Sequence, residues 1–344
     1  MKSVFFITSS GSIYRRALPL IDQKSKDGEV LVVTSNDNTY KFFTNYTPFK
    51  TIQSRVNPNL IAGKDKIFKL ISNVVKSKFE YRKLFKDIKG SNIYFFNTGN
   101  TIVTFSYIQK LAKHNKIFFY SSEKDKLDKQ IKPTIFNSWY TKVVISFIKL
   151  TLGIDIKVRK DCHLISLCVY KEFFAKNNIT DTYQEFDQNI YKKYMKKIDL
   201  VDKKVLVLWS DLVSEGRIDE KTFTEQSNQL IQLLKEYYPN KYIIKAHPNM
   251  SLLYGLMVNQ PQLESYVPSQ FFMYHPWKVV IADCSAALVF PEEQNLTKTK
   301  LIEMVDILKF KDSKVQKELK QFLISWNPKL LFPQSFKELE RMLK

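Results

Sequence analysis

The sequence predicts an α/β protein of two domains, each built on a parallel β-sheet with helices on its faces. Its 344 residues suggest two domains at roughly 150 residues each. Hydrophobic residues make up 44% and charged residues 26% of the chain, which is typical of a soluble globular protein. Short apolar runs alternate with helical patterns, and this order is typical of parallel sheets.

In the first half, the strands are predicted from short apolar runs bounded by polar residues. The run Val30–Thr34 has no alternation, which indicates a strand buried on both faces. A turn-forming Thr-Ser-Ser-Gly-Ser segment follows the first run, and a helix should begin near Tyr14. The predicted strands are 3–8, 30–34, 92–96 and 116–120, and the later predicted helices are 68–85 and 104–114.

The second half repeats this alternation of strand and helix. A long amphipathic helix is predicted at Glu220–Tyr237, and a further helix is expected to open just after the last apolar run, at Ser285. The predicted strands are 204–209, 242–245 and 278–282.

The domain boundary is predicted between about 155 and 200. Residues 1–155 form a first Rossmann-like domain, 156–200 a connector, 201–308 a second Rossmann-like domain, and 309–344 amphipathic helices. Two such domains facing a cleft make the GT-B architecture of glycosyltransferases, with ligands at the carboxyl ends of the strands. Periodicity alone equally allows a periplasmic-type binding protein or a two-domain kinase.

Positive charge is concentrated in the first half of the chain. The protein has 54 Lys and Arg against 34 Asp and Glu, a net charge of +20. Residues 1–150 hold 26 basic and 10 acidic residues, or +16, which leaves +4 for the rest. The pattern indicates either a codon bias toward Lys or an anionic partner such as a glycan, a membrane surface or nucleic acid. Seven scattered Arg residues make sequence-specific nucleic-acid binding the weaker choice.

Cysteine content and hydropathy indicate a reducing, cytoplasmic environment. The three cysteines, Cys162, Cys168 and Cys284, are odd in number and unclustered, which disfavours a disulfide framework or a Cys-type zinc site. No apolar run reaches the 18 residues that a membrane span needs, and the apolar N-terminal run is too short for a signal-peptide core.

Two segments at strand ends carry candidate chemistry. His247-Pro248 directly follows a strand, where an imidazole could donate to a phosphate or protonate a leaving phosphate oxygen. Asp283, Cys284, Ser285 and Ala286 follow another strand and read as a phosphate-binding turn at a helix start. The alternatives are a structural histidine and an ordinary Ser N-cap.

These segments, with Val267-Pro268-Ser269-Gln270-Phe271 between them, resemble bacterial sialyltransferases of the lipooligosaccharide sialyltransferase and polysialyltransferase group. That group combines a His-Pro strand end, a Pro-Ala-Glu-Phe segment and a Ser-Ser or Ser-Thr turn. The stretch 208–216, which includes Asp211, Ser214, Glu215 and Gly216, also looks like that group's loop after the first strand of the nucleotide domain. The resemblance covers roughly residues 204–290.

The resemblance implies inverting, metal-independent transfer of a nonulosonic acid from a CMP-sugar to a bacterial surface glycan, without a cofactor. It implies that His247 acts on the leaving phosphate, and that Pro248, Ser269, Gln270, Ser214, Glu215, Gly216 and residues 284–286 surround the nucleotide. The group's acid-acid-Gly motif, which supplies the general base, corresponds here to Glu123. Ser122 and Lys124 break that motif, so Asp125 and Asp211 are second-choice bases.

Departures from the group's pattern leave other donors and classes open. Gln270 replaces an acid and Cys284 replaces a hydroxyl. Pseudaminic, legionaminic or Kdo-type sugars are therefore alternative donors. A CDP-glycerol polymer transferase, a nucleic-acid-binding module and an inactive binding relative are the alternative functions.

The segment 309–326 predicts an amphipathic helix with Val315, Leu319, Phe322, Leu323 and Trp326 on one face and lysines nearby. Such a helix usually packs on its own domain, but apolar and basic residues together also suit a peripheral contact with the inner membrane face. The resemblance also makes a homodimer an expectation.

Overall fold

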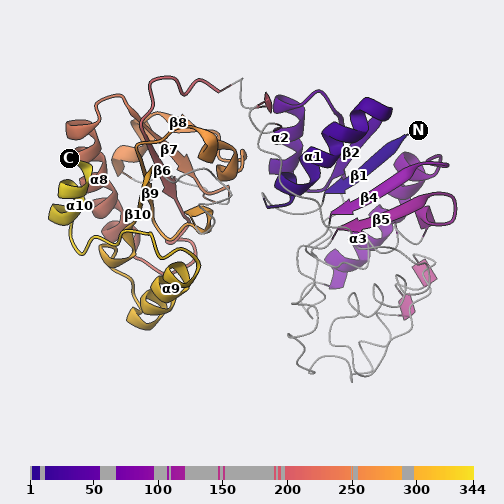
Figure 1. Ribbon diagram of the computed structural model, residues 1–344. Coiled ribbons are helices and arrows are strands. Elements are labelled where there is room, and N and C mark those ends of the chain that lie inside the picture. The colour runs from indigo at the N-terminus through magenta and orange to yellow at the C-terminus, as the bar shows by residue number, and fades with distance from the viewer. Residues whose placement is uncertain are drawn as a thin grey trace. The chain divides into compact units, whose positions relative to one another are not determined.

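The computed structural model describes residues 2–7, 12–54, 67–96, 110–120, 198–248, 255–288 and 298–344. It also describes residues 107, 146, 147, 150, 151, 190, 193, 194 and 250. The chain divides into two compact units, Met1–Asp187 and Gln188–Lys344, and Figure 1 shows a separate sheet in each.

The first unit contains a parallel sheet whose strands are ordered β3-β2-β1-β4-β5 in the described residues. These strands are β1 (Ser3–Ile7), β2 (Val30–Thr34), β3 (Lys50–Gln53), β4 (Asn92–Phe96) and β5 (Lys116–Tyr120). Its described helices include α1 (Ser12–Asp27), α2 (Asp37–Tyr46) and α3 (Ile67–Glu80), and α3 continues into a π-helical turn, Tyr81–Phe85. The four predicted strands are confirmed, whereas β3 and α2 were not predicted.

Aromatic residues pair across the central strands of this sheet. Phe5 stacks on Tyr94 with ring centroids 4.6 Å apart, and Tyr94 stacks on Phe118 at 4.9 Å. On the other face, Phe6 stacks on Phe95 at 4.5 Å. Such cross-strand pairs stabilise a sheet and fix its register, so they explain why these apolar runs form one ladder.

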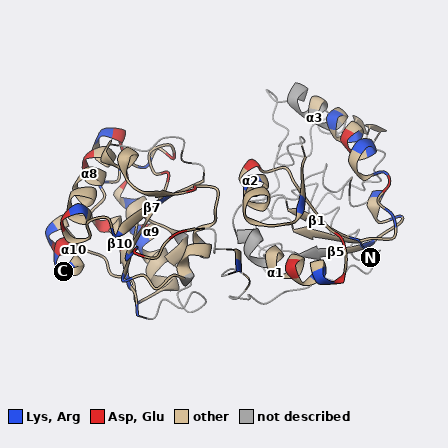
Figure 2. Ribbon diagram, turned by 90° about the horizontal axis from the view of Figure 1, so that it is seen from above, with Lys and Arg blue, Asp and Glu red and all other residues tan. Residues whose placement is uncertain are grey.

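Basic residues recur along α3 and the π-helical turn that follows it (Figure 2). Lys110 lies over the ring of Tyr81, with its ammonium 4.9 Å from the ring centroid. Burial lowers the pKa of Lys110, and the nearby charges of Lys78, Arg82 and Lys113 lower it further. Part of the positive charge predicted for the first half is therefore gathered on one surface.

The second unit contains a parallel sheet ordered β10-β9-β6-β7-β8 in the described residues. Its strands are β6 (Val205–Trp209), β7 (Tyr242–Ala246), β8 (Gln262–Leu263), β9 (Val279–Ala282) and β10 (Lys300–Glu303). The helices are α8 (Glu220–Tyr237), α9 (Ser313–Trp326) and α10 (Phe336–Leu343), with 3-10 turns η3 (Gly255–Asn259), η4 (Ser269–Tyr274), η5 (Ala286–Leu288) and η7 (Met304–Asp306). Strands β8 and β10 were not predicted.

Both sheets have the strand order of the Rossmann fold. In each, the first strand lies in the middle, the next two strands extend to one side and the last two to the other. The prediction of two Rossmann-like domains, the components of the GT-B architecture, is confirmed. In the second unit the order reverses between β6 and β9, and ligands of such sheets bind outside the carboxyl ends of the strands at this point.

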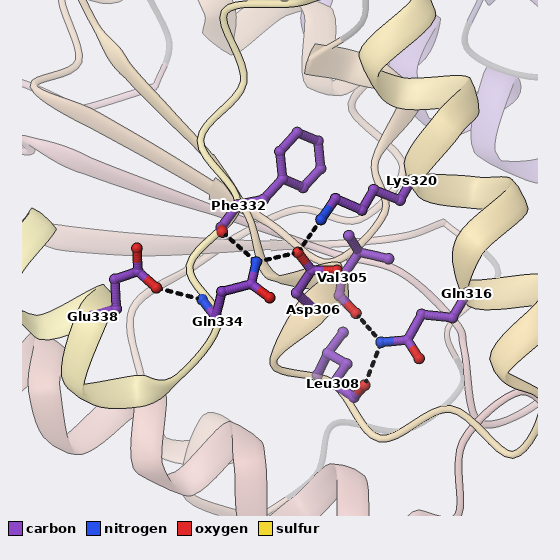
Figure 3. A network of polar contacts seen from close by, with 8 residues as sticks. All are labelled: Val305, Asp306, Leu308, Gln316, Lys320, Phe332, Gln334 and Glu338. Atoms are coloured by element: carbon purple, nitrogen blue, oxygen red, sulfur yellow. Dashed lines mark hydrogen bonds and ion pairs between the residues drawn. The ribbon is translucent and has the colours of Figure 1, made fainter.

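The C-terminal helices pack on the second unit. Leu339 and Leu343 of α10 join the hydrophobic core that α8 forms with the sheet. Figure 3 shows how α9 is fastened: Gln316 donates to the carbonyls of Val305 and Leu308, and Lys320 pairs with Asp306. On the predicted apolar face Leu323 is buried, but Phe322 and Trp326 remain 47% and 53% exposed. The helix thus packs with only part of that face.

Candidate functional site

The carboxyl edge of the second sheet brings together three predicted segments. These are the loop 210–217 after β6, His247 after β7 and the turn 283–285 after β9. Hydrogen bonds join the strand ends: the backbone N–H of His247 donates to the carbonyl of Trp209 at 2.7 Å. The backbone N–H of Ser210 donates to Oδ1 of Asp283 at 2.5 Å. Residues far apart in the sequence are therefore held at one edge.

The loop after β6 is folded back on itself. The N–H of Glu215 donates to the carbonyl of Asp211 at 3.1 Å, and the N–H of Arg217 donates to the carbonyl of Leu212 at 2.9 Å. Gly216 has a φ of +71°, a conformation that favours glycine. Ser214, Glu215 and Gly216 are exposed, whereas Asp211 is buried. The Glu215 carboxylate pairs with Nε of Arg217 at 2.7 Å.

His247 lies at the end of β7, and Pro248 starts a turn in which the N–H of Met250 donates to the His247 carbonyl at 3.0 Å. His247 is exposed to solvent, but nearby protein atoms remove part of the water around its imidazole. This desolvation lowers the pKa of His247, the charge of Lys245 lowers it further, and Asp211 and Glu215 oppose the change. The imidazole is therefore mostly neutral near pH 7 and can both donate and accept a hydrogen bond.

Lys245 is a buried cation that was not singled out from the sequence. Its side chain lies in β7 and the residue is 3% exposed. Its Nζ donates to the carbonyl of Ala246 at 2.7 Å and to that of Ser265 at 2.9 Å. Burial lowers the pKa of Lys245 to about 7. The signal in the sequence was a lysine within an otherwise apolar strand.

Lys245 ties β7 to the segment that carries Ser269 and Gln270. Val267 and Phe271 of this segment are each 1% exposed, and Ser269 opens the 3-10 turn η4. The N–H of Trp277 Nε1 donates to the carbonyl of Phe272 at 2.7 Å. Buried apolar residues therefore anchor the segment, and Ser269 is left partly exposed.

The turn after β9 is organised by two buried carboxyl groups. Asp283 and Glu303 are 0% exposed, and the N–H of Cys284 donates to Oε2 of Glu303 at 2.8 Å. Burial raises the pKa of both carboxyl groups well above their ordinary values, and the charge of Asp283 raises that of Glu303 further. Oδ2 of Asp283 and Oε1 of Glu303 are buried without a hydrogen-bond partner among the described residues.

This arrangement differs from the expected phosphate-binding turn. Cys284 has a φ of +76°, and its N–H points to an internal carboxyl group. The backbone N–H of Ser285 also acts on the Glu303 carboxyl group and, like the N–H of Cys284, opposes the rise in its pKa. Burial, together with the charges of Glu303 and Asp283, raises the pKa of the Cys284 thiol. The N–H groups of Cys284 and Ser285, which were expected to face a ligand, thus face the buried Glu303.

Ser285 behaves as the N-terminal residue of a short turn. Its Oγ accepts from the N–H of Ala287 at 3.3 Å, and its carbonyl accepts from the N–H of Leu288 at 3.1 Å. Within the described residues, the predicted helix is represented by the 3-10 turn η5, with Ala286 as its first residue. Ser285 is partly exposed, and it follows the carboxyl end of β9.

The predicted bases Glu123 and Asp125 lie outside the described residues, as does the acid-acid-Gly segment that contains them. The side chains of Gln270 and Ala286 also lie outside the described part of the structure. Within the described part of the chain, no three or more His, Cys, Asp and Glu side chains form a group that could hold a metal ion. None of the described helices has the length and apolar character needed to cross a membrane.

Comparisons with known proteins find structural similarity at low sequence identity. No family model matches the sequence, and no curated protein matches it. The chain is similar to the calicheamicin glycosyltransferase CalG4, with 9% identity, coverage of 98% of this chain and 88% of that chain, and a TM-score of 0.43. It is also similar to the E. coli heptosyltransferase WaaC with ADP, with 10% identity, 100% and 99% coverage, and a TM-score of 0.45. The Neisseria meningitidis UDP-GlcNAc 2-epimerase bound to UDP-GlcNAc gives 13% identity, 99% and 90% coverage, and a TM-score of 0.39.

Proposed function

We propose that this protein is an inverting, metal-independent glycosyltransferase that moves a nonulosonic acid from a CMP-sugar to a bacterial glycan. The observation that carries the proposal is the position of His247 at the carboxyl edge of the second sheet, beside the strand-order reversal between β6 and β9. Nucleotides bind at this point in Rossmann-like sheets. The His-Pro, Val-Pro-Ser and Ser segments there are those that resemble the bacterial sialyltransferase group.

In the proposed reaction, a base removes the proton of an acceptor hydroxyl. The hydroxyl oxygen then bonds to the anomeric carbon of the donor sugar as the bond from that carbon to the CMP phosphate oxygen breaks. His247 donates a hydrogen bond or its proton to that oxygen, so the CMP leaves with its charge compensated. The neutral imidazole suits this role because the arriving phosphate raises the pKa of a nearby histidine.

The remaining residues of the edge have supporting roles in the proposal. Ser285 offers its hydroxyl to the phosphate, while Ser269 and Gln270 lie toward the ribose or cytosine. Asp211 is buried and its charge acts on His247, which favours a role in setting the protonation of that histidine over a role as base. Glu123 therefore remains the first choice of base.

An anionic, lipid-linked acceptor at the inner membrane face is the second part of the proposal. The basic surface formed by Lys78, Arg82, Lys110 and Lys113 in the first unit suits an acidic glycan or lipid. The exposed aromatic rings of Phe322 and Trp326, 6.2 Å apart, could enter the headgroup region. Both features favour a protein that meets its acceptor at a membrane surface.

Thermal unfolding with CMP, CDP, UDP, ADP and GDP, each with and without EDTA, tests the donor. A nucleotide at 100 times its dissociation constant stabilises the folded state by about 2.7 kcal/mol. We expect CMP to raise the melting temperature, EDTA to have no effect, and His247→Asn to abolish the response. His114→Asn, an exposed residue of the first unit, is the matched control. A response to UDP or ADP in place of CMP would reject the donor, and no response to any nucleotide would reject the transferase.

Activity then needs a separate test. We expect release of CMP from a CMP-nonulosonic acid in the presence of a glycan acceptor, and loss of that release in Glu123→Gln with nucleotide binding retained. If Glu123→Gln turns over normally, the base is another residue.

A further inference from the structure

Side chains are the candidates for holding the phosphate of a donor nucleotide at this edge, because the N–H groups of Cys284 and Ser285 face the buried Glu303. The N–H of Cys284 is bonded to the buried Glu303, and the backbone N–H of Ser285 acts on the same carboxyl group, opposing the rise in its pKa. A phosphate needs several donors or cations to replace its water. Three described basic side chains at or near the edge are those of His247, Lys245 and Arg217.

Of these three side chains, that of Arg217 has the most hydrogen-bond donors left for a ligand. Lys245 is 3% exposed and donates to two carbonyls, and His247 carries at most one charge. The guanidinium of Arg217 has five N–H donors, and its one ion pair among the described residues is the bond from Nε to Glu215. The Arg217 side chain is 35% exposed and that of Glu215 is 48% exposed, so a ligand can reach both.

The position of the pair also fits a phosphate at the strand ends. The charge of Arg217 lowers the pKa of the Cys284 thiol, and the charge of Glu215 acts on His247, Asp283 and Cys284. The pair therefore lies among the ends of β6, β7 and β9. Its backbone is fixed independently of the side chains, because the N–H of Arg217 bonds to Leu212 and its carbonyl accepts from Lys311 at 2.9 Å.

We propose that Arg217 binds the phosphate of the nucleotide, and that Glu215 holds the guanidinium in place until the phosphate replaces it. This inference rests on the proposed function and assigns a phosphate-binding residue to its site. The planar guanidinium matches two phosphate oxygens, a geometry that an ammonium cannot reproduce. Glu215, expected from the sequence to contact the nucleotide, instead competes with it for Arg217.

The competition predicts opposite effects for the two partners. Arg217→Met should weaken CMP binding about 10- to 100-fold, the usual value of charge-assisted hydrogen bonds. Arg217→Lys should give an intermediate loss. Glu215→Gln should strengthen CMP binding several-fold, since the phosphate no longer displaces a carboxylate. A purely structural pair would weaken binding in both variants.

The experiment is isothermal titration of the full chain with CMP, UDP, ADP and cytidine. Arg341→Met on α10 is the matched control for loss of one positive charge, and far-UV circular dichroism checks folding. The proposal is supported if Arg217→Met lowers the affinity for the nucleotide that the wild type binds and leaves the affinity for cytidine unchanged. Equal nucleotide affinity in wild type and Arg217→Met, or weaker binding in Glu215→Gln, would overturn the assignment of Arg217.

The outcomes separate this inference from the proposed function. Binding of UDP or ADP in preference to CMP rejects the CMP donor, while the Arg217 variants still test the phosphate contact with the preferred nucleotide. Failure of the wild type to bind any of the three nucleotides rejects both.

Discussion

The carboxyl group of Glu303, at the end of β10, accepts a 2.8 Å hydrogen bond from the backbone N–H of Cys284, just beyond the end of β9. The bond joins the ends of two neighbouring strands through a residue that is 0% exposed. It holds Cys284 in a left-handed conformation with a φ of +76°, which costs about 1–2 kcal/mol in a non-glycine residue. The shape of the turn at the candidate site thus depends on a buried acid.

The first prediction concerns the protons on the buried acids. Because the pKa values of Asp283 and Glu303 are raised on folding, the folded state keeps protons that the unfolded chain releases. The free energy of unfolding should therefore fall as the pH rises above about 4.5. Glu303→Gln should reduce that fall. Urea unfolding followed by tryptophan fluorescence from pH 4.5 to 8 measures it, and Glu318→Gln, an exposed residue of α9, is the control. Parallel pH profiles for wild type and Glu303→Gln would contradict the prediction.

The second prediction concerns Lys245, whose pKa is lowered to about 7 from 10.5. The folded state binds this proton less tightly than the unfolded chain, so stability should rise between about pH 7 and 10.5. Below pH 7, burial of the charged lysine lowers the free energy of unfolding by about 5 kcal/mol. Lys245→Met removes it but also loses two hydrogen bonds of about 1 kcal/mol each. We expect a variant more stable than wild type at pH 6, with an advantage that shrinks by pH 10. Lys241→Met, on an exposed residue, should show no such dependence.

The third prediction compares two glycines of the second unit, Gly255 and Gly216, with φ of +55° and +71°. A Cβ at Gly255 would lie 2.2 Å from Oδ1 of Asn228, which accepts from the N–H of Leu256 at 2.7 Å. A Cβ at Gly216 meets nothing within 4 Å. Gly255→Ala should therefore cost about 2–4 kcal/mol and Gly216→Ala about 1 kcal/mol. Chemical denaturation measures both, and equal losses would show that the clash relaxes at no cost.

The fourth prediction tests the surface of α9 against lipid. Phe322→Ser and Trp326→Ser should each lower binding to phosphatidylglycerol vesicles about tenfold, because each removes a half-exposed aromatic ring. Val258→Ser, at a residue that is 56% exposed in a different part of the unit, serves as the control. Cosedimentation with phosphatidylglycerol and with phosphatidylcholine vesicles measures the effect. Binding that is equal for the two lipids, or unchanged in both variants, would remove the membrane from the proposal.

The strands with strong apolar runs were predictable, and the edge strands were not. β1, β2, β6 and β9 are buried on both faces, so their sequences are continuously apolar. β3 (Lys50–Gln53) is polar and partly exposed, and β8 has two residues, so neither gives a hydrophobic pattern. β10 ends in the buried Glu303, an acid that local hydropathy assigns to the surface.

The site was predictable to the level of strand ends. Parallel strands place the residues that follow them at one edge, so His247 and the turn 283–285 could be assigned to it from the sequence. Pairings between distant residues could not. Glu303 follows Cys284 by 19 residues. The surroundings of Arg217 and Lys245 likewise depend on residues that only folding brings close to them.

Strand β10 is the outer strand of its sheet in the described residues, yet part of its free backbone edge is hydrogen-bonded to another segment of the chain. The N–H of Leu331 donates to the carbonyl of Leu301, and the N–H of Glu303 donates to the carbonyl of Leu331, each at 2.9 Å. Uncovered strand edges pair with the edges of other molecules and lead to aggregation. The segment around Leu331 therefore covers this edge of the sheet. We expect that a chain truncated before Leu331 would associate with other copies through β10.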